Sequence, residues 1–153
     1  MIRTEAEYQL AKKRVLEEKT RLSEYEVRVK ETPGFGPAEL KRLMDPLRSF
    51  TLQLDEEVEA YERILRGSFE TIDSPGSVGR LLIAARIYRK LSQRELADRL
   101  EVHESQVSRD ERNEYRGVTV ARGQRILDVM RVKPRVEMIP LSEEGDTMDR
   151  GGV

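Results

Sequence analysis

Residues Leu91–Tyr115 read LSQRELADRLEVHESQVSRDERNEY, and this stretch decides which fold the sequence predicts. Ser92 and Glu95 form a Ser-x-x-Glu capping box, in which the hydroxyl and the carboxylate satisfy backbone N–H groups at the start of a helix. A short helix therefore begins at this point. Its narrow apolar face, suited to close packing against a second helix, consists of Leu96, Ala97 and Leu100.

The second half of this stretch predicts a different kind of helix. After a break at residues 101–103, Val107 is the only apolar side chain between Glu104 and Arg112. Such a helix packs at one point and exposes its polar side chains. Two short helices joined by a turn of three or four residues, the second of them polar, are typical of a helix-turn-helix DNA-binding unit.

Two motifs in this unit resemble those of the lambda-repressor-like (Cro-like, XRE) helix-turn-helix family. The L-S/T-Q-x-E-L-A core of that family here reads LSQRELA, from Leu91 to Ala97. The following motif, V-x-x-S-x-V-S-R-x-E, here reads VHESQVSRDE, from Val102 to Glu111. The two motifs together are specific, and they imply a DNA-reading fold for about a third of the chain.

The resemblance also implies which side chains contact DNA. The N-terminal half of the polar helix would face base edges in the major groove, and residues around it would hold phosphates. The residues at base-reading positions are Glu104, Ser105, Gln106 and Arg109. The expected phosphate contacts are Gln93, Arg94, Ser108, Asn113, Tyr115 and Arg116. Arg109 can form a bidentate pair with guanine, and Gln106 with adenine.

Comparison with the family motif predicts one ion pair, shows two departures from the motif and leaves one alternative open. The resemblance implies a largely buried ion pair between Arg86 and Glu111, whose disruption should destabilise the fold more than its presence stabilises it. The chain departs from the motif at Glu101, where a left-handed turn usually has glycine, and at His103, where the helix cap is usually Ser or Thr. For residues 113–117, a solvated loop is the alternative to a DNA contact.

The composition favours a helical protein with a small core. Of the 153 residues, 37% are hydrophobic and 37% are charged, which suits one compact domain or two small ones. The chain has no cysteine and one histidine, which excludes thiolate and multi-histidine metal sites. We expect no cofactor, no metal and a cytoplasmic location. We also expect no membrane span, because no segment approaches the roughly 20 apolar residues that one requires.

The charge is unevenly distributed along the chain. The net charge of −1 combines −3 for residues 1–76, +6 for residues 77–135 and −4 for residues 136–153. The positive segment coincides with the helix-turn-helix unit. Because each neutralised phosphate of DNA releases counterions, this asymmetry favours a DNA-binding surface over an arginine-rich face that is only solvated.

The N-terminal third predicts a long helix with one apolar seam. Thr4 and Glu7 form another capping box, and a helix from there to about Lys30 would end at the proline- and glycine-rich residues 32–37. One charged residue, Glu18, interrupts the seam. The seam consists of Tyr8, Ala11, Val15, Leu22, Tyr25 and Val29.

Two interpretations are open for residues 38–66. A short helix over residues 38–44 can precede a second helix that begins at Asp45 and Pro46, or one helix can run through with a kink at Pro46. The expected apolar positions are Leu40, Leu43, Leu47, Phe50, Leu54, Tyr61 and Leu65. In both cases we expect an antiparallel helical hairpin used for packing or oligomerisation. The glutamates of residues 56–62 are expected to be a solvated face rather than a metal site.

These elements predict an all-α fold with one short strand. Ser77 and Thr119 are placed to cap the first and last helices of the second domain. The residues after Pro134 suit a lone strand, which would need another copy of the chain or another protein as its partner. The predicted segments are a helical hairpin (1–67), a linker (68–76), a helix-turn-helix domain (77–133), a short strand (134–141) and a disordered acidic tail (142–153).

The leading functional prediction is a transcriptional regulator. One unit makes few base contacts, so we expect a homodimeric repressor that reads a palindromic operator and is joined through the hairpin or the strand. A narrower alternative is the antitoxin of a type II toxin–antitoxin module. Residues 2–8, IRTEAEY, and the pair Tyr61-Glu62 resemble the N-terminal part of HigA-type antitoxins, which bind a toxin and repress their own operon.

Two other classes of function are alternatives to a regulator. A helical scaffold that has kept the fold without DNA binding is one alternative. An enzyme is not expected, because the sequence lacks a phosphate loop, a metal constellation and a nucleophile with a histidine base.

Overall fold

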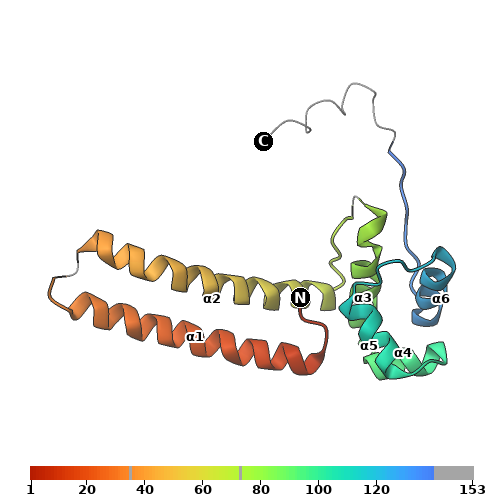
Figure 1. Ribbon diagram of the computed structural model, residues 1–153, viewed down its shortest axis with the longest axis horizontal. Helices are drawn as coiled ribbons and strands as arrows, with labels where there is room; N and C mark the ends of the chain where they lie inside the picture. The colour runs from red at the N-terminus through yellow and green to blue at the C-terminus, as the bar shows by residue number, and fades with distance from the viewer. Residues whose placement is uncertain (35, 73, 140–153) are drawn as a thin grey trace.

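The computed structural model describes residues 1–34, 36–72 and 74–139, and in these residues all regular secondary structure is helical. A long hairpin of two helices projects from a small helical domain (Figure 1). The hairpin consists of α1 (Glu5–Glu31) and α2 (Pro37–Leu65). The domain consists of η1 (Pro75–Ser77), α3 (Val78–Tyr88), α4 (Gln93–Leu100), α5 (Glu104–Arg112) and α6 (Val120–Met130).

The predictions for α1 are confirmed. The Thr4 hydroxyl accepts a hydrogen bond from the Glu7 N–H at 3.2 Å, and the Glu7 carboxylate accepts one from the Thr4 N–H at 3.3 Å. These two bonds are the capping box that starts the helix. Along the predicted seam, Tyr8, Val15 and Val29 are buried, and the other seam residues are half-buried.

The helix α2 runs unbroken through Pro46, so the interpretation as two successive helices is wrong and residues 38–65 belong to one helix, as the other interpretation has it; the kink at Pro46 stays a prediction. Met44 and Thr51, on either side of the proline, are 0% and 6% exposed. Because both are buried, packing holds the two halves of α2 in one helix although a proline removes one backbone hydrogen bond. The Thr51 hydroxyl donates to the Leu47 carbonyl at 3.0 Å, so the buried threonine has a partner.

The continuous helix also changes which apolar residues face inward. The inner face carries Met44, Thr51 and Val58, at seven-residue intervals. Leu43, Leu47 and Phe50, which were expected in the seam, are 38 to 43% exposed. These three residues lie at the margin of the inner face, because Thr51 rather than Phe50 occupies the inner position.

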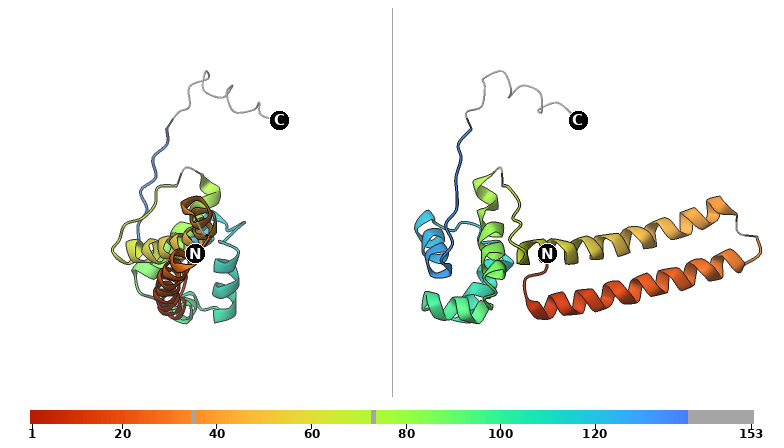
Figure 2. Two further views of the ribbon diagram at one scale, coloured as in Figure 1. Left: turned by 90° about the vertical axis from the view of Figure 1, so that its left-hand side faces the viewer. Right: turned by 180° about the vertical axis from the view of Figure 1, so that it is seen from behind.

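Ring stacking and polar contacts connect the two helices of the hairpin along their length. At the end near the domain, the rings of Tyr8 and Tyr61 stack with their centroids 4.8 Å apart. The Tyr8 hydroxyl donates to Glu62 at 2.7 Å. Further out, Lys19 pairs with Asp55 at 2.6 Å and Arg48 with Glu26 at 3.0 Å. Figure 2 shows the hairpin from its tip and from behind, with α1 and α2 side by side in both views.

One apolar core joins the domain to the base of the hairpin. The short helix α3 is at its centre, with seven of its 11 residues buried. Residues from the other domain helices pack around α3, and the same cluster contains Ile2, which precedes α1, and Tyr8 and Tyr61 of the hairpin. The domain residues in this cluster include Leu82, Ile83, Leu96, Leu100, Val107, Ile126 and Met130. The hairpin is therefore an extension of the domain core and not a separately tethered unit.

The segment after α6 corrects one prediction. Residues 134–139 form no strand, and residues 140 and 141 of the predicted strand lie outside the described residues, as does the predicted acidic tail (142–153). Val136, Met138 and Ile139 are more than three-quarters exposed, because no neighbouring strand is available to them in the described part of the chain. In residues 1–34, 36–72 and 74–139, no helix has the length and apolar character needed to cross a membrane.

Candidate nucleic-acid interface

The turn between α4 and α5 forms in spite of its two unusual residues. Ser92 and Glu95 make the predicted capping box at the start of α4, with bonds of 2.7 and 3.1 Å. Glu101 has φ 58°, in the left-handed region where glycine is usual. His103 caps α5, because its Nδ1 atom accepts from the Ser105 N–H at 3.2 Å. The histidine thus replaces the expected Ser or Thr as a hydrogen-bond acceptor.

The helix α5 has one inward face and one polar outward face. Only Val107 and Glu111, four residues apart, are buried. Of the predicted base-reading residues, Glu104, Ser105 and Arg109 are exposed. This arrangement leaves the polar face of a short helix open along the N-terminal half of α5, as insertion into a major groove requires.

A buried ion pair fixes α5 to α3. The Arg86 guanidinium donates to both carboxylate oxygens of Glu111, with Nε–Oε1 and Nη2–Oε2 distances of 2.5 and 2.8 Å. Its Nη1 atom donates to the Leu91 carbonyl at 2.7 Å. Arg86 is 3% exposed and Glu111 is 0% exposed. The pair that the family resemblance implies therefore sets the position of the polar helix relative to the core.

Two further segments form hydrogen bonds with this ion pair. The Gln93 side-chain amide, at the start of α4, donates to Glu111 at 2.8 Å. The Arg86 guanidinium also donates to the backbone carbonyl of Arg3 at 2.9 Å. The residues before α1 therefore lie next to the N-terminus of α4, and the hairpin and the reading unit are held by one hydrogen-bonded network.

A second network orients Gln106, which is half-buried. When its amide oxygen faces Arg122, that oxygen accepts from the guanidinium at 2.9 and 3.1 Å. The same arginine, in the first turn of α6, donates to Asp110 at 2.5 Å. Because the amide oxygen accepts from Arg122, the Gln106 NH₂ group is left to donate a hydrogen bond to a base. Arg122 was not predicted, although the Thr119 cap indicated that it lies in the first turn of a helix.

The loop after α5 is packed against α3 and not fully solvated. Glu114 and Tyr115 both have φ 51°. A Cβ atom at Gly79 of α3 would lie 1.7 Å from the Glu114 carbonyl oxygen, so only glycine allows the loop to approach this closely. Asn113 and Arg116 are exposed beside this contact.

Tyr115 lies in the core and not among the exposed polar residues. Its side chain is buried, and its hydroxyl has no hydrogen-bond partner in the described residues. Burial, followed by the charges of Glu111 and Asp110, raises the pKa of this hydroxyl. In this conformation Tyr115 fixes the loop, and it is not available as a phosphate contact.

The other predicted phosphate-binding residues occupy three kinds of position. Arg94 is exposed in the first turn of α4, and Arg116 and Asn113 are exposed after α5. Gln93 and Ser108 are half-buried, and Gln93 is already bonded to Glu111. The described residues contain no group of three or more His, Asp or Glu side chains that could hold a metal ion.

Comparison with known proteins agrees with this geometry for one part of the chain. Residues 82–136 match the model of a family described as helix-turn-helix. This match indicates a DNA-binding regulatory domain in the second half of the chain. Neither the curated proteins nor the solved structures contain a match to this chain.

Proposed function

We propose that this chain is a sequence-specific regulator of transcription that binds double-stranded DNA. The observation that carries the proposal is the exposed polar face of α5, held in place by the buried Arg86–Glu111 pair. The net charge of +6 over residues 77–135 supports attraction to phosphates. In this proposal Glu104, Ser105, Gln106 and Arg109 read bases.

Arg109 has the largest expected share of base discrimination. Its exposed guanidinium can pair with guanine in a bidentate manner, which contributes about 1–3 kcal/mol to the choice of base. Arg116, which is exposed after the end of α5, is proposed to bind a phosphate instead. Substitution of the two arginines should therefore change DNA binding in different ways, because a base contact affects specificity and a phosphate contact affects the salt dependence.

The test measures binding of the purified full chain to the DNA upstream of its own gene over a series of salt concentrations. Arg109→Ala should remove the preference for the footprinted site. Arg116→Ala should weaken binding to all sequences alike and lower the salt slope by about 1. Arg63→Ala, which removes an exposed arginine of the hairpin, is the control. Binding that is indifferent to DNA sequence and to Arg109→Ala would refute the proposal.

We also propose that the regulator is a homodimer joined through the hairpin. Leu43, Leu47 and Phe50 form a partly exposed apolar strip along α2. At 100° per residue, Asp55 lies about 140° around the helix from Phe50, so the Lys19–Asp55 pair lies away from the strip. The Arg14 guanidinium of α1 lies over the Phe50 ring, 5.5 Å from its centroid. A second copy that packs against the strip would bury it and bring two reading helices to two half-sites.

The dimer is tested by placing a charge in this strip. Leu47→Asp should give a monomer in sedimentation and weaken DNA binding. The matched control is Leu52→Asp, in the same helix, because Leu52 is 60% exposed and lies outside the strip. A Leu47→Asp protein that sediments as a dimer would rule out this surface.

A second candidate function, the antitoxin, has one observation in its favour. A groove of about 490 Å³ lies where the hairpin meets the domain. Its carboxylates are Glu56, Glu57, Glu70 and Glu114, against Arg63, Arg80 and the Met1 amino group, which lies 3.5 Å from Glu57, and Ile64 and Ile72 add apolar surface. A basic protein partner fits this charge.

Co-expression with the products of adjacent genes tests the antitoxin role. A basic partner should co-purify with the chain, and the double variant Glu56→Lys, Glu57→Lys should release it without loss of DNA binding. A partner retained by that variant, or no partner among the neighbouring gene products, would count against the role.

A further inference from the structure

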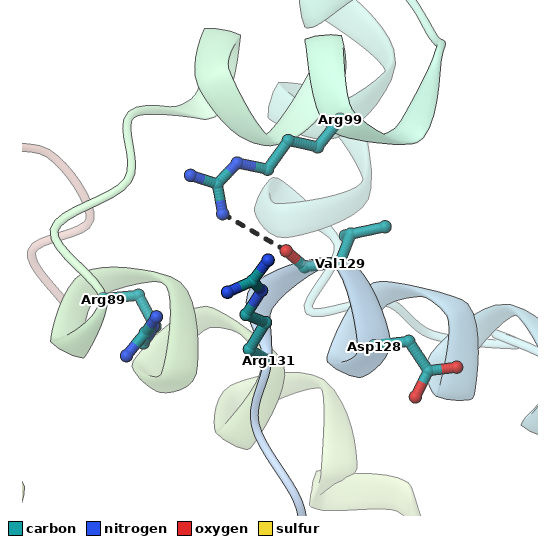
Figure 3. A pocket seen from close by; sticks show the side chains of 5 residues that line it. All are labelled: Arg89, Arg99, Asp128, Val129 and Arg131. Atoms are coloured by element: carbon teal, nitrogen blue, oxygen red, sulfur yellow. Dashed lines mark hydrogen bonds between the residues drawn. The ribbon is translucent and has the colours of Figure 1, made fainter.

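Arg89, Arg99 and Arg131 line an open pocket on the domain (Figure 3). They come from the C-terminal ends of three helices: Arg89 follows α3, Arg99 lies in the last turn of α4, and Arg131 follows α6. The pocket has a volume of about 600 Å³, and its other lining residues are Asp128 and Val129. None of the lining residues belongs to α5 or to the loop after it, so the pocket is distinct from the proposed DNA-reading face.

Among the described residues, the three arginines have no acidic partner, a property that they share with most arginines of the domain, of which only three have one. Arg86, Arg122 and Arg125 each form an ion pair, with Glu111, Asp110 and Glu101 respectively. Within residues 1–34, 36–72 and 74–139, no carboxylate pairs with Arg89, Arg99 or Arg131. The Arg99 Nη1 atom donates to the Val129 carbonyl at 3.2 Å, and this is the contact marked in Figure 3.

The one carboxylate at the pocket does not neutralise it. Asp128 accepts a hydrogen bond from the Gln124 amide at 2.7 Å, one turn earlier in α6. In Figure 3 its carboxylate points away from the three guanidinium groups. Because arginine side chains in proteins stay charged, three guanidiniums against one carboxylate leave a surplus of two positive charges.

Helix geometry explains part of this cluster but not all of it. The partial negative charge at helix C-termini attracts basic residues, which accounts for each arginine taken singly. However, Arg131 has φ 55°, and Lys90, which follows Arg89 in the chain, has φ 54°. Glycine is the residue that favours this left-handed position after a helix. At both positions the chain has a basic side chain where a glycine would be less strained.

We propose that Arg89, Arg99 and Arg131 form a binding site for a small phosphate-bearing anion, such as a diphosphate group that can contact all three guanidiniums. Guanidinium groups bind phosphate oxygens in a bidentate manner, and three of them around one opening can share two phosphoryl groups. The open side of the pocket leaves room for the rest of a larger ligand. The site does not depend on the proposed reading of DNA by α5.

Isothermal titration of the full chain with inorganic pyrophosphate, in the absence of DNA, tests this site. The wild type should bind with a saturable stoichiometry of one per chain. Arg131→Gly and Arg99→Gln should each weaken binding by tenfold or more. Arg131→Gly is the sharper variant, because glycine suits the left-handed backbone and a lost fold should not be the cause. Arg21→Gln, an exposed arginine of α1, controls for the lost charge and should bind as the wild type does.

Two results would overturn the proposal. One is pyrophosphate binding that is absent, does not saturate, or is unchanged in both pocket variants while their melting temperatures equal that of the wild type. The other concerns the source of the phosphate. If Arg99→Gln and Arg131→Gly weaken binding to duplex DNA as much as Arg116→Ala does, the cluster serves the DNA backbone and not a free ligand.

Discussion

The hairpin and the domain bury their side chains to very different extents. In α1, three of 27 residues are buried, whereas in α3 seven of 11 are buried. Each hairpin helix therefore rests on a single seam, with ion pairs such as Lys19–Asp55 beside it. The domain helices surround a packed core that contains one buried ion pair. We infer that the domain supplies the rigidity that a reading helix needs, and that the hairpin supplies surface.

The largest expected effect comes from breaking the buried pair. Glu111→Ala leaves the Arg86 charge buried without its partner, which should cost about 3–5 kcal/mol of unfolding free energy. Urea denaturation followed by circular dichroism measures this loss. Glu59→Ala, which removes an exposed carboxylate in α2, should cost less than about 1 kcal/mol. Equal losses from the two variants would contradict the inferred contrast between domain and hairpin.

A pair of cavity variants compares the two regions directly. Leu96→Ala, at a fully buried position in α4, should cost about 2–5 kcal/mol. Val15→Ala, in the seam of α1, should cost about 1–2 kcal/mol, since two methyl groups are lost beside a helix that can relax. The same denaturation experiment measures both. A loss for Val15→Ala as large as that for Leu96→Ala would mean that the hairpin is as tightly packed as the domain.

The ion pairs of the hairpin should depend on salt where the buried pair does not. Lys19→Ala removes the exposed partner of Asp55 and should cost about 0.2–1 kcal/mol at low salt. In 1 M salt, where the Debye length falls to about 3 Å, the difference from the wild type should shrink. The loss from Glu111→Ala should stay nearly constant over the same range. A salt-independent loss for Lys19→Ala would argue that this contact is packing and not charge.

The smallest expected effects are on stability at acid pH, with one carboxylate in the hairpin and one in the domain. Hydrogen bonds from Lys30 and then Arg48 lower the pKa of Glu26 below its ordinary 4.5, and the Ser92 backbone and hydroxyl lower that of Glu95 below the same value. The folded state then binds these protons less readily than the unfolded state. Their stabilisation is complete at pH values above 4.5, and it is lost as the pH falls through the lowered pKa values.

Melting temperatures between pH 7 and pH 3 measure this dependence. Glu26→Gln and Glu95→Gln should each flatten the acid side of the curve slightly. Glu17→Gln, in the exposed part of α1, should leave the curve unchanged. Variants whose curves parallel that of the wild type down to pH 3 would show that neither carboxylate is linked to folding.

The parts of the fold that depend on near neighbours were predictable from the sequence. The capping boxes at Thr4 and Ser92 need only residues three positions apart, and both form. The Thr119 cap forms as well, since its hydroxyl accepts from the Arg122 N–H at 3.2 Å. Ser77 stands at the cap position of α3, but its hydroxyl accepts from the Arg80 side chain instead of capping the helix.

The features that the sequence did not predict depend on contacts between distant residues. Pro46 stays inside a helix because Met44 and Thr51 are buried on both sides of it. The bond from Arg86 to the Arg3 carbonyl joins residues 83 positions apart, and no local pattern indicates it. Tyr115 has the aromatic and polar character of a phosphate contact, yet packing under α3 places it in the core.

The attachment of Arg3 to Arg86 also has a consequence for the order in which the chain folds. During synthesis the hairpin emerges before the domain, and since most of its contacts are between its own helices they can form while the domain is still being made. Ile2 and Arg3 are an exception, because their site is complete only when Arg86 and Glu111 have both been added. We therefore expect Ile2 and Arg3 to reach their final place after the hairpin helices have paired, and their docking to be a slow phase of refolding because it closes a loop between residues 83 positions apart.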